Sequence, residues 1–492
     1  MEVGAVMYSL LPLLSLIVPF FAGVLCLFTY PFRFLEPFSK RIEKVSLLFG
    51  TGLTLVTVLS SVQQVFAGEP LETPILSLRV DLTNAAAVLG VSSIFFITSL
   101  YNVKAERGGR LKASLYNFFV MLLLFCMLGL TLSYDLFGIF LFVELTIGAS
   151  IVLVVHAPGK SPPEAAFKYL IITSISALFV LLGVLMIYIS TGTSNLFDIM
   201  GRPDSLAGNP RLTFLAAACF VIGFGADIGL VPFHGWVPDV FPASTPAVNS
   251  FSCAEPIALV FALYKMLHLL HAILPSPAIV TLAAGTGIVS MVFGALLAYP
   301  QRDFMRMIAY CSIDEFGHMV FALSLFTPQS FTAGMMYLVN GALMKSGVLQ
   351  GLGSVLIARG TSDMDSLGGL VGGMKKTSVG YAICVLSLVG VPPLSGFHAK
   401  WLLYNATYEY LLHRAGISAS IAALALLACI SMVSFVFLVR SFHRIFLGRS
   451  LGDQRNVAEV HWTMWLPTAA TAAIAVAVGL QPNLLLGLVR PP

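Results

Sequence analysis

Ionisable side chains stand inside stretches of this sequence that are otherwise almost entirely apolar. Glu144 lies in LFGIFLFVELTIGASIVLVV, about ten residues from either end of that stretch. Asp227 and His234 flank a proline in VIGFGADIGLVPFHGW, and Lys345 lies within YLVNGALMKSGVLQGL. Inserting a charged group into a membrane costs about 2.5 kcal/mol or more, so such residues are functional candidates. Carboxylates, imidazoles and amines at this depth can pass protons to one another through water.

Three further residues extend this set. Glu255 directly precedes Pro256, at a second helix-breaking position. His398 and Lys400 end the segment VPPLSGFHAK and mirror the pair formed by Asp227 and His234. Lys345 has no acid within one turn on its own helix, so it needs either a partner elsewhere or a lowered pKa, and either would suit a proton relay.

Several of these residues also have a simpler structural interpretation. Lys168 follows Glu164 by four residues in EAAFKYL, and this spacing also suits an ordinary surface ion pair. Glu144 can be a carboxylate paired with a basic residue on a neighbouring helix, and His234 can simply hydrogen-bond the carbonyls freed by the proline. His268 and His271 are expected near the membrane interface. Four more residues are possible members of the set: Lys265, Asp314, Glu315 and His318.

The elements that must position these groups are long apolar segments. The chain is 58% apolar and 10% charged, whereas about a quarter of the residues of soluble domains are charged. A membrane-spanning helix needs roughly 20 apolar residues. We therefore predict an all-α polytopic membrane protein with about fourteen spans, near residues 7–29, 44–66, 83–102, 114–132, 134–156, 166–190, 212–233, 248–271, 277–298, 305–326, 330–358, 378–410, 417–446 and 463–485.

Two of these segments are interrupted by proline at matching places, VPFHGWVPD (231–239) and VPPLSGFHAK (391–400). Proline removes a backbone donor and kinks a helix, so neighbouring groups or water must satisfy the freed carbonyls. Interrupted segments in corresponding halves of a membrane protein indicate an ion or substrate path. The pattern predicts a protein that moves something across a membrane.

Basic residues are distributed unevenly among the connecting loops. Loops that follow odd-numbered segments hold most of them, for example Lys40, Arg107, Lys160 and Lys375. Loops that follow even-numbered segments hold only Arg79, Arg202, Arg211 and Arg414. By the positive-inside rule the odd loops face the cytoplasm, which predicts that both termini lie on the outer side.

The sequence carries no fingerprint for a redox or nucleotide cofactor. The seven cysteines are scattered through apolar segments without a C-x-x-C pair, and they are interpreted as small buried apolar residues. We therefore expect no cofactor in this chain and no redox or nucleotide site of its own. Whether it counts as an enzyme is left open, because any redox or ATP chemistry would belong to a partner.

The interrupted segments carry a family resemblance. VPFHGWVPDVFPASTPAVNS resembles the signature of proton-conducting antiporter-like membrane subunits. This family includes the large membrane subunits of respiratory NADH:quinone oxidoreductase, the A and D subunits of Mrp-type sodium/proton antiporters and subunits of energy-converting membrane-bound hydrogenases. Further similar motifs follow in order over about residues 80–450: SYDLFGIFLFVEL, EAAFKYL, QRDFMRMIAYCSI, YLVNGALMKSGVL, SLGGLVGGM and GVPPLSGFHAKW.

The resemblance implies fourteen helices with two inverted repeats, each containing a broken helix. It assigns proton-path roles to Glu144, Lys168, His234, Lys345 and Lys400. Two positions depart from the family pattern. The family usually has lysine where this chain has Asp227, and another lysine near Leu259, where this chain instead has Glu255 one turn earlier. The first half-channel is therefore expected to run on carboxylates or not to conduct.

The resemblance also implies an organisation and a set of partners. We expect N-terminal helices in 1–110, a first half-channel in 111–272, a second in 273–447, and a C-terminal loop and last helix in 448–492. The expected function is translocation of H⁺, or exchange of Na⁺ and H⁺, in a redox-driven bacterial or archaeal membrane complex. Iron–sulfur clusters or other redox centres would lie in partner subunits and a peripheral arm. The alternatives are a subunit of a non-redox Mrp-type antiporter or uptake system, and a non-conducting scaffold. No nucleic acid partner is expected.

Overall fold

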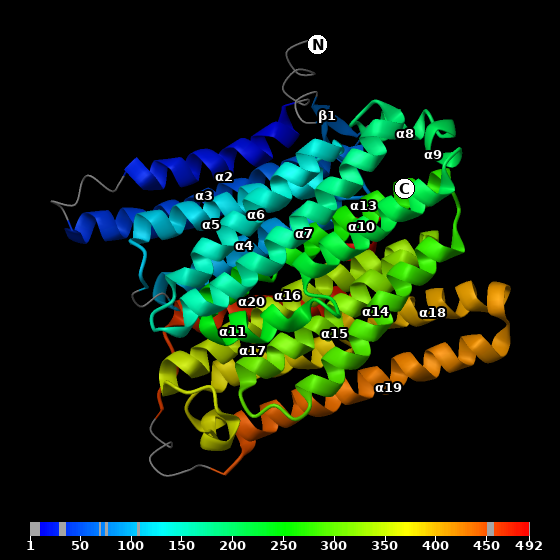
Figure 1. Ribbon diagram of the computed structural model, residues 1–492. Helices are drawn as coiled ribbons and strands as arrows, with labels where there is room; N and C mark the ends of the chain where they lie inside the picture. Colours follow the sequence, from blue (N-terminus) through cyan, green and yellow to red (C-terminus); the bar gives the residue numbers. More distant parts are fainter. Residues whose placement is uncertain are drawn as a thin grey trace.

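The computed structural model describes residues 10–28, 36–67, 70–73, 77–105, 109–449 and 457–491. Figure 1 shows long helices that lie side by side across the molecule, with a short hairpin at one end. The hairpin pairs β1 (Leu71–Thr73) with β2 (Leu78–Val80) in antiparallel register. The long helices of the first part are α2 (Leu11–Phe28), α3 (Glu36–Ala67), α4 (Ala85–Ala105), α5 (Ala113–Leu132), α6 (Leu136–His156), α7 (Ser161–Thr191), α10 (Pro210–Ile228) and α13 (Glu255–Ile273).

The second part continues the same arrangement. Its helices are α14 (Pro277–Ala298), α15 (Phe304–Ser324), α16 (Pro328–Arg359), α17 (Lys375–Val389), α18 (Ser395–Ala415), α19 (Ile417–Phe442) and α20 (Trp462–Leu480). Short helices join them: α8 (Leu196–Met200), α9 (Asp204–Ala207), η3 (His234–Trp236), α11 (Val237–Ala243), α12 (Pro246–Ser252), η4 (Met364–Ser366), η5 (Leu370–Gly372), η6 (His443–Leu447) and α21 (Asn483–Leu486).

The structure confirms a polytopic all-α membrane protein, although it does not confirm the predicted number of spans. Among the described residues, twelve helical stretches are long and apolar enough to cross a membrane. The two remaining predicted segments are helical as well. Segment 305–326 forms α15, which carries Arg306, Asp314 and Glu315, and segment 378–410 is divided between α17 and α18.

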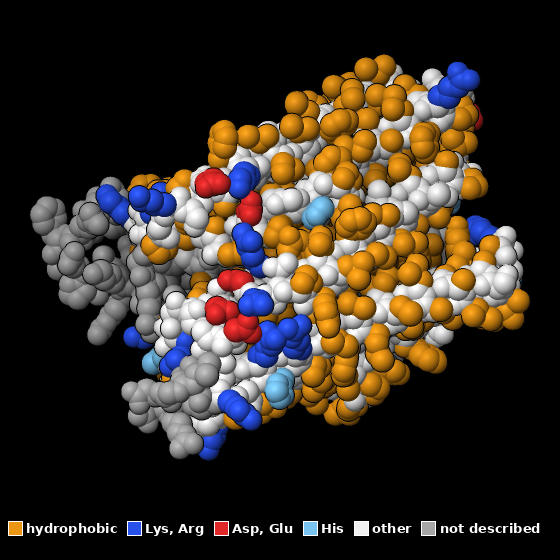
Figure 2. Space-filling model, turned by 60° about the horizontal axis from the view of Figure 1, so that its bottom comes forward, with side chains coloured by type: hydrophobic (Ala, Val, Ile, Leu, Met, Phe, Trp, Pro, Cys, Tyr) orange, Lys and Arg blue, Asp and Glu red, His pale blue; other side chains and the backbone are white. Residues whose placement is uncertain are grey.

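The two ends of the molecule differ in composition. One end, called here the hairpin end, holds β1, β2 and α8. The C-terminal segment lies there too, because the Arg490 amide donates to the Leu82 carbonyl (3.0 Å). The opposite end, called here the basic end, holds the loops at Lys160, Arg302 and Lys375. In Figure 2 lysine and arginine side chains gather at one end of the visible face, and apolar side chains cover most of the rest. This is the pattern of a protein that spans a bilayer.

An internal repeat relates α6 to α15. Asp135 caps α6 and accepts a hydrogen bond from Ser194, and Asp303 caps α15 and accepts one from Ser362. The helices that follow, α7 and α16, both end at a glycine with φ of 71°. Because α6 starts at the hairpin end and α15 at the basic end, the two copies run in opposite directions (Figure 1). This agrees with the predicted inverted repeat.

The two proline breaks share one backbone design. α10 ends at Gly229 (φ 92°) and α17 ends at Gly390 (φ 85°), and in each case a cis proline follows three residues later, at Pro232 and Pro393. The left-handed conformation of both glycines favours a residue without Cβ. Each break therefore stops one helix inside the molecule and lets the next start nearby in a new direction.

Candidate functional site

A cavity beside the first break gathers the acidic residues of the first half. The cavity has a volume of about 40 Å³ and is lined by Asp227 from α10, Glu255 from α13 and Ser150 from α6, among others. Asp227 and Glu255 are 3% and 8% exposed. The Ser150 hydroxyl donates to Glu255 Oε1 (2.6 Å), whereas Asp227 Oδ2 accepts no hydrogen bond from any described residue. A water molecule needs roughly 10–15 Å³ of such volume, so water in this cavity can link the two carboxyl groups.

The backbone of the first break is satisfied by side chains from its surroundings. Trp236 Nε1 donates to the Ala226 carbonyl (3.0 Å), and the Val231 amide donates to Ser290 Oγ on α14 (3.0 Å). His234 is half-buried, and its Nδ1 has no hydrogen-bond partner among the described residues. The simpler interpretation gave His234 the task of bonding carbonyls freed by the proline. Trp236 performs part of that task, because it bonds the Ala226 carbonyl.

Glu144 was expected to be buried, and in this chain it is exposed on the surface of α6. The two neighbouring residues Phe142 and Val143 are buried, so a small rotation about the helix axis decides which side chain faces outward. Glu144 still acts electrostatically on Asp227, together with Glu255. It therefore belongs to the same acidic group but stands at its outer margin.

Lys168 forms the surface ion pair that its spacing suggests. Its Nζ lies 3.1 Å from Glu164 and 3.0 Å from Asp239 of α11, and its side chain is 48% exposed. Arg306 of α15 also approaches Asp239 (3.8 Å). These contacts hold the start of α7 against α11 and α15 and do not bring Lys168 to the cavity.

The second half pairs acids with bases. Lys345 of α16 forms a buried ion pair with Glu315 of α15, so of the two alternatives the structure shows a partner on another helix. The same ammonium lies 4.5 Å from the centre of the Phe316 ring. One residue earlier, Asp314 Oδ1 lies 3.2 Å from His318 Nδ1, and its other oxygen accepts from Ser434 of α19 (2.6 Å).

Lys400 lies on α18, one turn past Gly396 of the second break, and is 8% exposed. Its Nζ donates to Ser431 Oγ (3.2 Å), which also bonds the Tyr404 hydroxyl (2.8 Å). Asp314 and Glu315 act on it electrostatically. Lys400 thus faces polar groups inside the protein, as a relay position requires.

Hydroxyl and amide groups line the second break. Ser387 Oγ and Ser395 Oγ are 3.0 Å apart, and Ser395 also bonds Asn340 of α16. The His398 ring Nε2 lies 2.9 Å from the Gly479 carbonyl of α20. His398 is therefore tied to the last helix, and Lys400, further along α18, is the residue directed toward the acids.

The two halves meet at α13 and α15. Phe316 lines the cavity of Asp227 and Glu255 and also lies under the Lys345 ammonium. Cys253, just before α13, interacts electrostatically with Lys345, Glu315 and Glu255. The ionisable groups thus form two sets, Glu144, Asp227 and Glu255 in the first half and Lys345, Glu315, Asp314, His318 and Lys400 in the second, and the two sets meet at Phe316 and Cys253.

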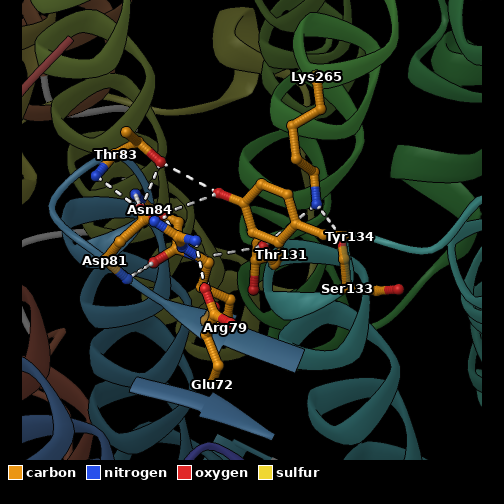
Figure 3. A network of polar contacts seen from close by, with 9 residues as sticks. All are labelled: Glu72, Arg79, Asp81, Thr83, Asn84, Thr131, Ser133, Tyr134 and Lys265. Atoms are coloured by element: carbon orange, nitrogen blue, oxygen red, sulfur yellow. Dashed lines mark hydrogen bonds and ion pairs between the residues drawn. The ribbon is translucent and has the colours of Figure 1, made fainter. Parts of the chain in front are cut away.

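Lys265 stands apart from this series. It is 6% exposed, and its Nζ donates to the carbonyls of Leu130 (3.0 Å), Thr131 (3.3 Å) and Ser133 (2.5 Å), at the end of α5. It also lies 4.8 Å from the Tyr134 ring centre. Figure 3 shows the ammonium beside the Tyr134 ring, whose hydroxyl points the other way, toward Thr83 and the Arg79–Asp81 pair.

These contacts give Lys265 a structural task. The last carbonyls of a helix lack intrahelical donors and carry the negative end of the helix dipole. A buried ammonium there donates hydrogen bonds to the carbonyls and places a positive charge at the negative end of the dipole. Lys265 also lines a cavity of about 400 Å³ at the hairpin end, with Asp81, Tyr134 and His268. His271 stacks on Phe326 and His268 on Tyr264, near the end of α13. Both histidines lie toward the hairpin end of the bundle, at the end of α13.

The hydroxyl partners of the ionisable residues were not predicted from the sequence. Ser150, Ser431 and Ser434 each bond one of them, and Asn340 closes the second break. The available signal was a serine in the middle of an apolar segment, which needs a polar partner when buried. That signal identifies a polar position but not its partner.

Six of the seven cysteines are buried, as expected, whereas Cys429 on α19 is exposed. Within the described ranges no three His, Cys, Asp or Glu side chains are grouped so as to hold a metal ion. The chemistry on view is that of proton or ion exchange among carboxyl, ammonium, imidazole and hydroxyl groups.

A polytopic helical bundle with two inverted repeats, two broken helices and a series of ionisable groups at membrane depth defines an ion-translocating membrane protein. Residues 133–424, more than half of the chain, match the family described as NADH:quinone oxidoreductase/Mrp antiporter, TM. The chain belongs to this family. It is an antiporter-like membrane subunit of a larger complex.

Comparisons with individual proteins agree. The chain is 28% identical over 471 residues to F(420)H(2) dehydrogenase subunit N of Methanosarcina mazei, an alignment that covers 92% of both chains. It is also 28% identical over 404 residues to the D subunit of the Na(+)/H(+) antiporter of Alkalihalophilus pseudofirmus, covering 80% of this chain and 77% of that one. Among solved structures, a chain of the archaeal membrane-bound sulfane sulfur reductase superposes with a TM-score of 0.84 at 25% identity, covering 98% of this chain and 96% of that chain.

Proposed function

We propose that this subunit conducts protons in a redox-driven membrane complex, along the series of ionisable groups from Glu144 to Lys400. The observation that carries the proposal is the gathering of buried ionisable groups in two adjacent sets, one on α6, α10 and α13 and one on α15, α16 and α18, which meet at Phe316. Every member has another ionisable member as an electrostatic neighbour. A proton can therefore move by short steps between groups that exchange charge.

The two halves would contribute different chemistry. Around its cavity the first half offers two carboxyl groups and no described cation, and the second half offers two acids with Lys345, Lys400 and His318. A charge change on Glu255 alters the field at Lys345, because the interior screens charges poorly. This coupling supports a division into half-channels at 111–272 and 273–447, with helices 1–110 and residues 448–492 flanking them.

We further propose that the basic end faces the cytoplasm of a bacterial or archaeal cell. Lys160, Arg302 and Lys375 lie at that end, and cytoplasmic loops are enriched in lysine and arginine. The C-terminal segment, tied to Leu82 at the hairpin end, would then lie on the outer side.

The similarity to F(420)H(2) dehydrogenase subunit N over nearly the whole of both chains favours a redox complex, with its redox centres in partner subunits. The similarity to the Na(+)/H(+) antiporter chain supports the alternative, a non-redox sodium/proton antiporter. A tag on this chain, purification from native membranes in mild detergent and identification of the bound subunits separate the two. We expect subunits with iron–sulfur or other redox centres, visible by electron paramagnetic resonance. Purification with antiporter subunits alone would contradict the redox assignment.

A further inference from the structure

A groove opens on the outside of the bundle between α17 and α20, at the basic end. Its volume is about 510 Å³. Lys375 and Lys376 line one end of it with Trp465, and only small or aliphatic residues such as Gly380, Ala473 and Val476 line the rest. Both helices begin at the basic end and run in the same direction (Figure 1). The groove is therefore charged where the membrane surface lies and apolar further in.

The two lysines are available to a ligand. Both are exposed, and neither forms an ion pair with any residue that the structure describes. The Lys376 ammonium lies 4.3 Å from the centre of the Trp465 ring, and this contact leaves its hydrogens free to bond. Two ammonium groups beside each other attract an anion with several oxygen acceptors.

The nearby acid does not neutralise this charge by ion pairing. Glu459 accepts from the amides of Lys376 (2.7 Å) and Thr377 (3.4 Å) and from the Thr377 hydroxyl (2.6 Å). Its carboxylate thus occupies the N-terminus of α17. An anion that enters the groove must bind to the ammonium groups, because the helix end is already filled.

The length of the groove fits one leaflet. Lys375 and Ile383 are eight residues apart on α17, which is ~12 Å along a helix, and Trp465 and Val476 are eleven residues apart on α20, which is ~16 Å. Half of the hydrocarbon core of a bilayer is ~15 Å thick. Tryptophan favours the depth of the headgroups, where Trp465 lies relative to the apolar part.

We propose that this groove binds an anionic phospholipid, with its phosphate at Lys375 and Lys376 and one acyl chain along Gly380, Ala473 and Val476. Basic pockets between membrane helices on the cytoplasmic side suit such headgroups. The groove is apolar and open to the bilayer, so a lipid reaches it without entering the protein. This inference goes beyond ion translocation and does not depend on the proposed ion path.

The site lies next to the second break. Gly479, three residues past Val476, packs against the Pro393 carbonyl so closely that a Cβ there would stand 2.1 Å from it, and its own carbonyl lies near His398. A lipid between α17 and α20 would brace the two helices that hold this break. Loss of the lipid should therefore loosen the helix pair that holds the break.

Lipid retention tests the proposal directly. The purified complex is exchanged into mixed micelles with equal amounts of phosphatidylglycerol and phosphatidylcholine that carry the same acyl chains, and bound lipids are counted by native mass spectrometry. We expect preferential retention of phosphatidylglycerol. The double change Lys375→Gln and Lys376→Gln should lower its retention roughly thirtyfold, the effect of two surface lysines on an anionic lipid.

Matched controls separate this site from general lipid binding. Ala473→Phe fills the apolar part and should also abolish retention, whereas Lys160→Gln, an exposed lysine at the same end but outside the groove, should not. Equal retention by all variants would show only general annular lipid and would overturn the proposal. A photo-crosslinking residue in place of Val379 should label lipid in the assembled complex, and a crosslink to another subunit instead would assign the groove to that partner.

Discussion

At the scale of single residues, the two halves of this protein surround their buried acidic residues with different partners. Glu315 and Lys345 neutralise each other, and Asp314 is held by His318 and Ser434. Asp227 and Glu255 share a small cavity, and the structure describes no cation lining it. A buried carboxyl group without a cation must find hydrogen-bond donors or carry a proton, so on the proposed path the first half would hold protons and the second would exchange charge.

Glu144→Gln should leave assembly intact and lower proton translocation by about a hundredfold, the usual contribution of an acid–base group. The amide fills the same volume but does not ionise. The measurement is proton uptake by the complex in sealed vesicles, followed with a pH-sensitive dye. Glu409→Gln, an exposed acid on α18, is the control and should pump normally. Pumping at the wild-type rate by the Glu144 variant would remove it from the path.

Asp227→Asn should uncouple redox turnover from translocation, so that electron transfer continues while fewer protons move per electron. The family usually has lysine at this position, but Asp227→Lys should not by itself give the activity of those members. A cavity of about 40 Å³ beside Glu255 leaves little room for a lysine side chain. The ratio of protons to electrons in vesicles measures both effects, with the exposed Asp204→Asn as control. An unchanged ratio in Asp227→Asn would show that the first half does not use this position.

At the scale of elements, helix ends and helix pairs carry the polar groups to their places. The two breaks stop α10 and α17 at left-handed glycines, and the α15–α16 contact brings Glu315 to Lys345. Lys265 ties α13 to the end of α5 through three carbonyls. In a membrane every such backbone group must be satisfied inside the protein, so these contacts fix the helices as well as the site.

Lys345→Met should destabilise the protein by about 3–5 kcal/mol, because it leaves the Glu315 carboxylate buried without its cation. The double variant Lys345→Met with Glu315→Gln should recover most of this loss, since neither charge remains. The midpoint of thermal unfolding in detergent, followed by circular dichroism, ranks the three proteins. A double variant as unstable as the single one would contradict the role of the ion pair.

Gly390→Ala should cost about 1–2 kcal/mol of stability, because φ there is 85° and an L-residue is strained in that region. The new Cβ would also stand 2.8 Å from Lys400 Cδ, so Lys400 must move and translocation should fall. Gly285→Ala in α14, where a Cβ meets nothing, is the matched control and should be neutral or slightly stabilising. Normal transport by the Gly390 variant would show that the position of Lys400 tolerates this shift.

At the scale of the whole molecule, the separation of charge between the ends sets the orientation in the membrane. The basic end should face the cytoplasm and the hairpin end the outside. In a background with Cys429→Ser, which removes the one exposed cysteine of the described residues, Lys160→Cys and Arg202→Cys place one thiol at each end. A membrane-impermeant maleimide should label Arg202→Cys on intact cells and Lys160→Cys only in inverted vesicles. The opposite pattern would reverse the orientation.

The sequence by itself determined the class of protein, and it also supplied most of the residues proposed for the ion path. Long apolar segments can be stable only in a bilayer, and a charge within one has few reasons to be there, so composition and position along the chain suffice for both conclusions. The proline breaks can also be predicted from the sequence, because proline interrupts the turn of helix in which it lies. These features do not depend on which helices are neighbours.

Only the tertiary structure decided which groups meet. Glu144 faces outward because of a rotation of α6 that one residue of register can reverse, and Lys345 meets Glu315 because α15 packs on α16. Lys265, in the same kind of apolar segment as Lys345, caps a helix instead of joining the series. A sequence indicates how deep in the membrane a charged residue lies. Its partner, however, lies on another helix, and the packing between distant segments determines which residue that partner is.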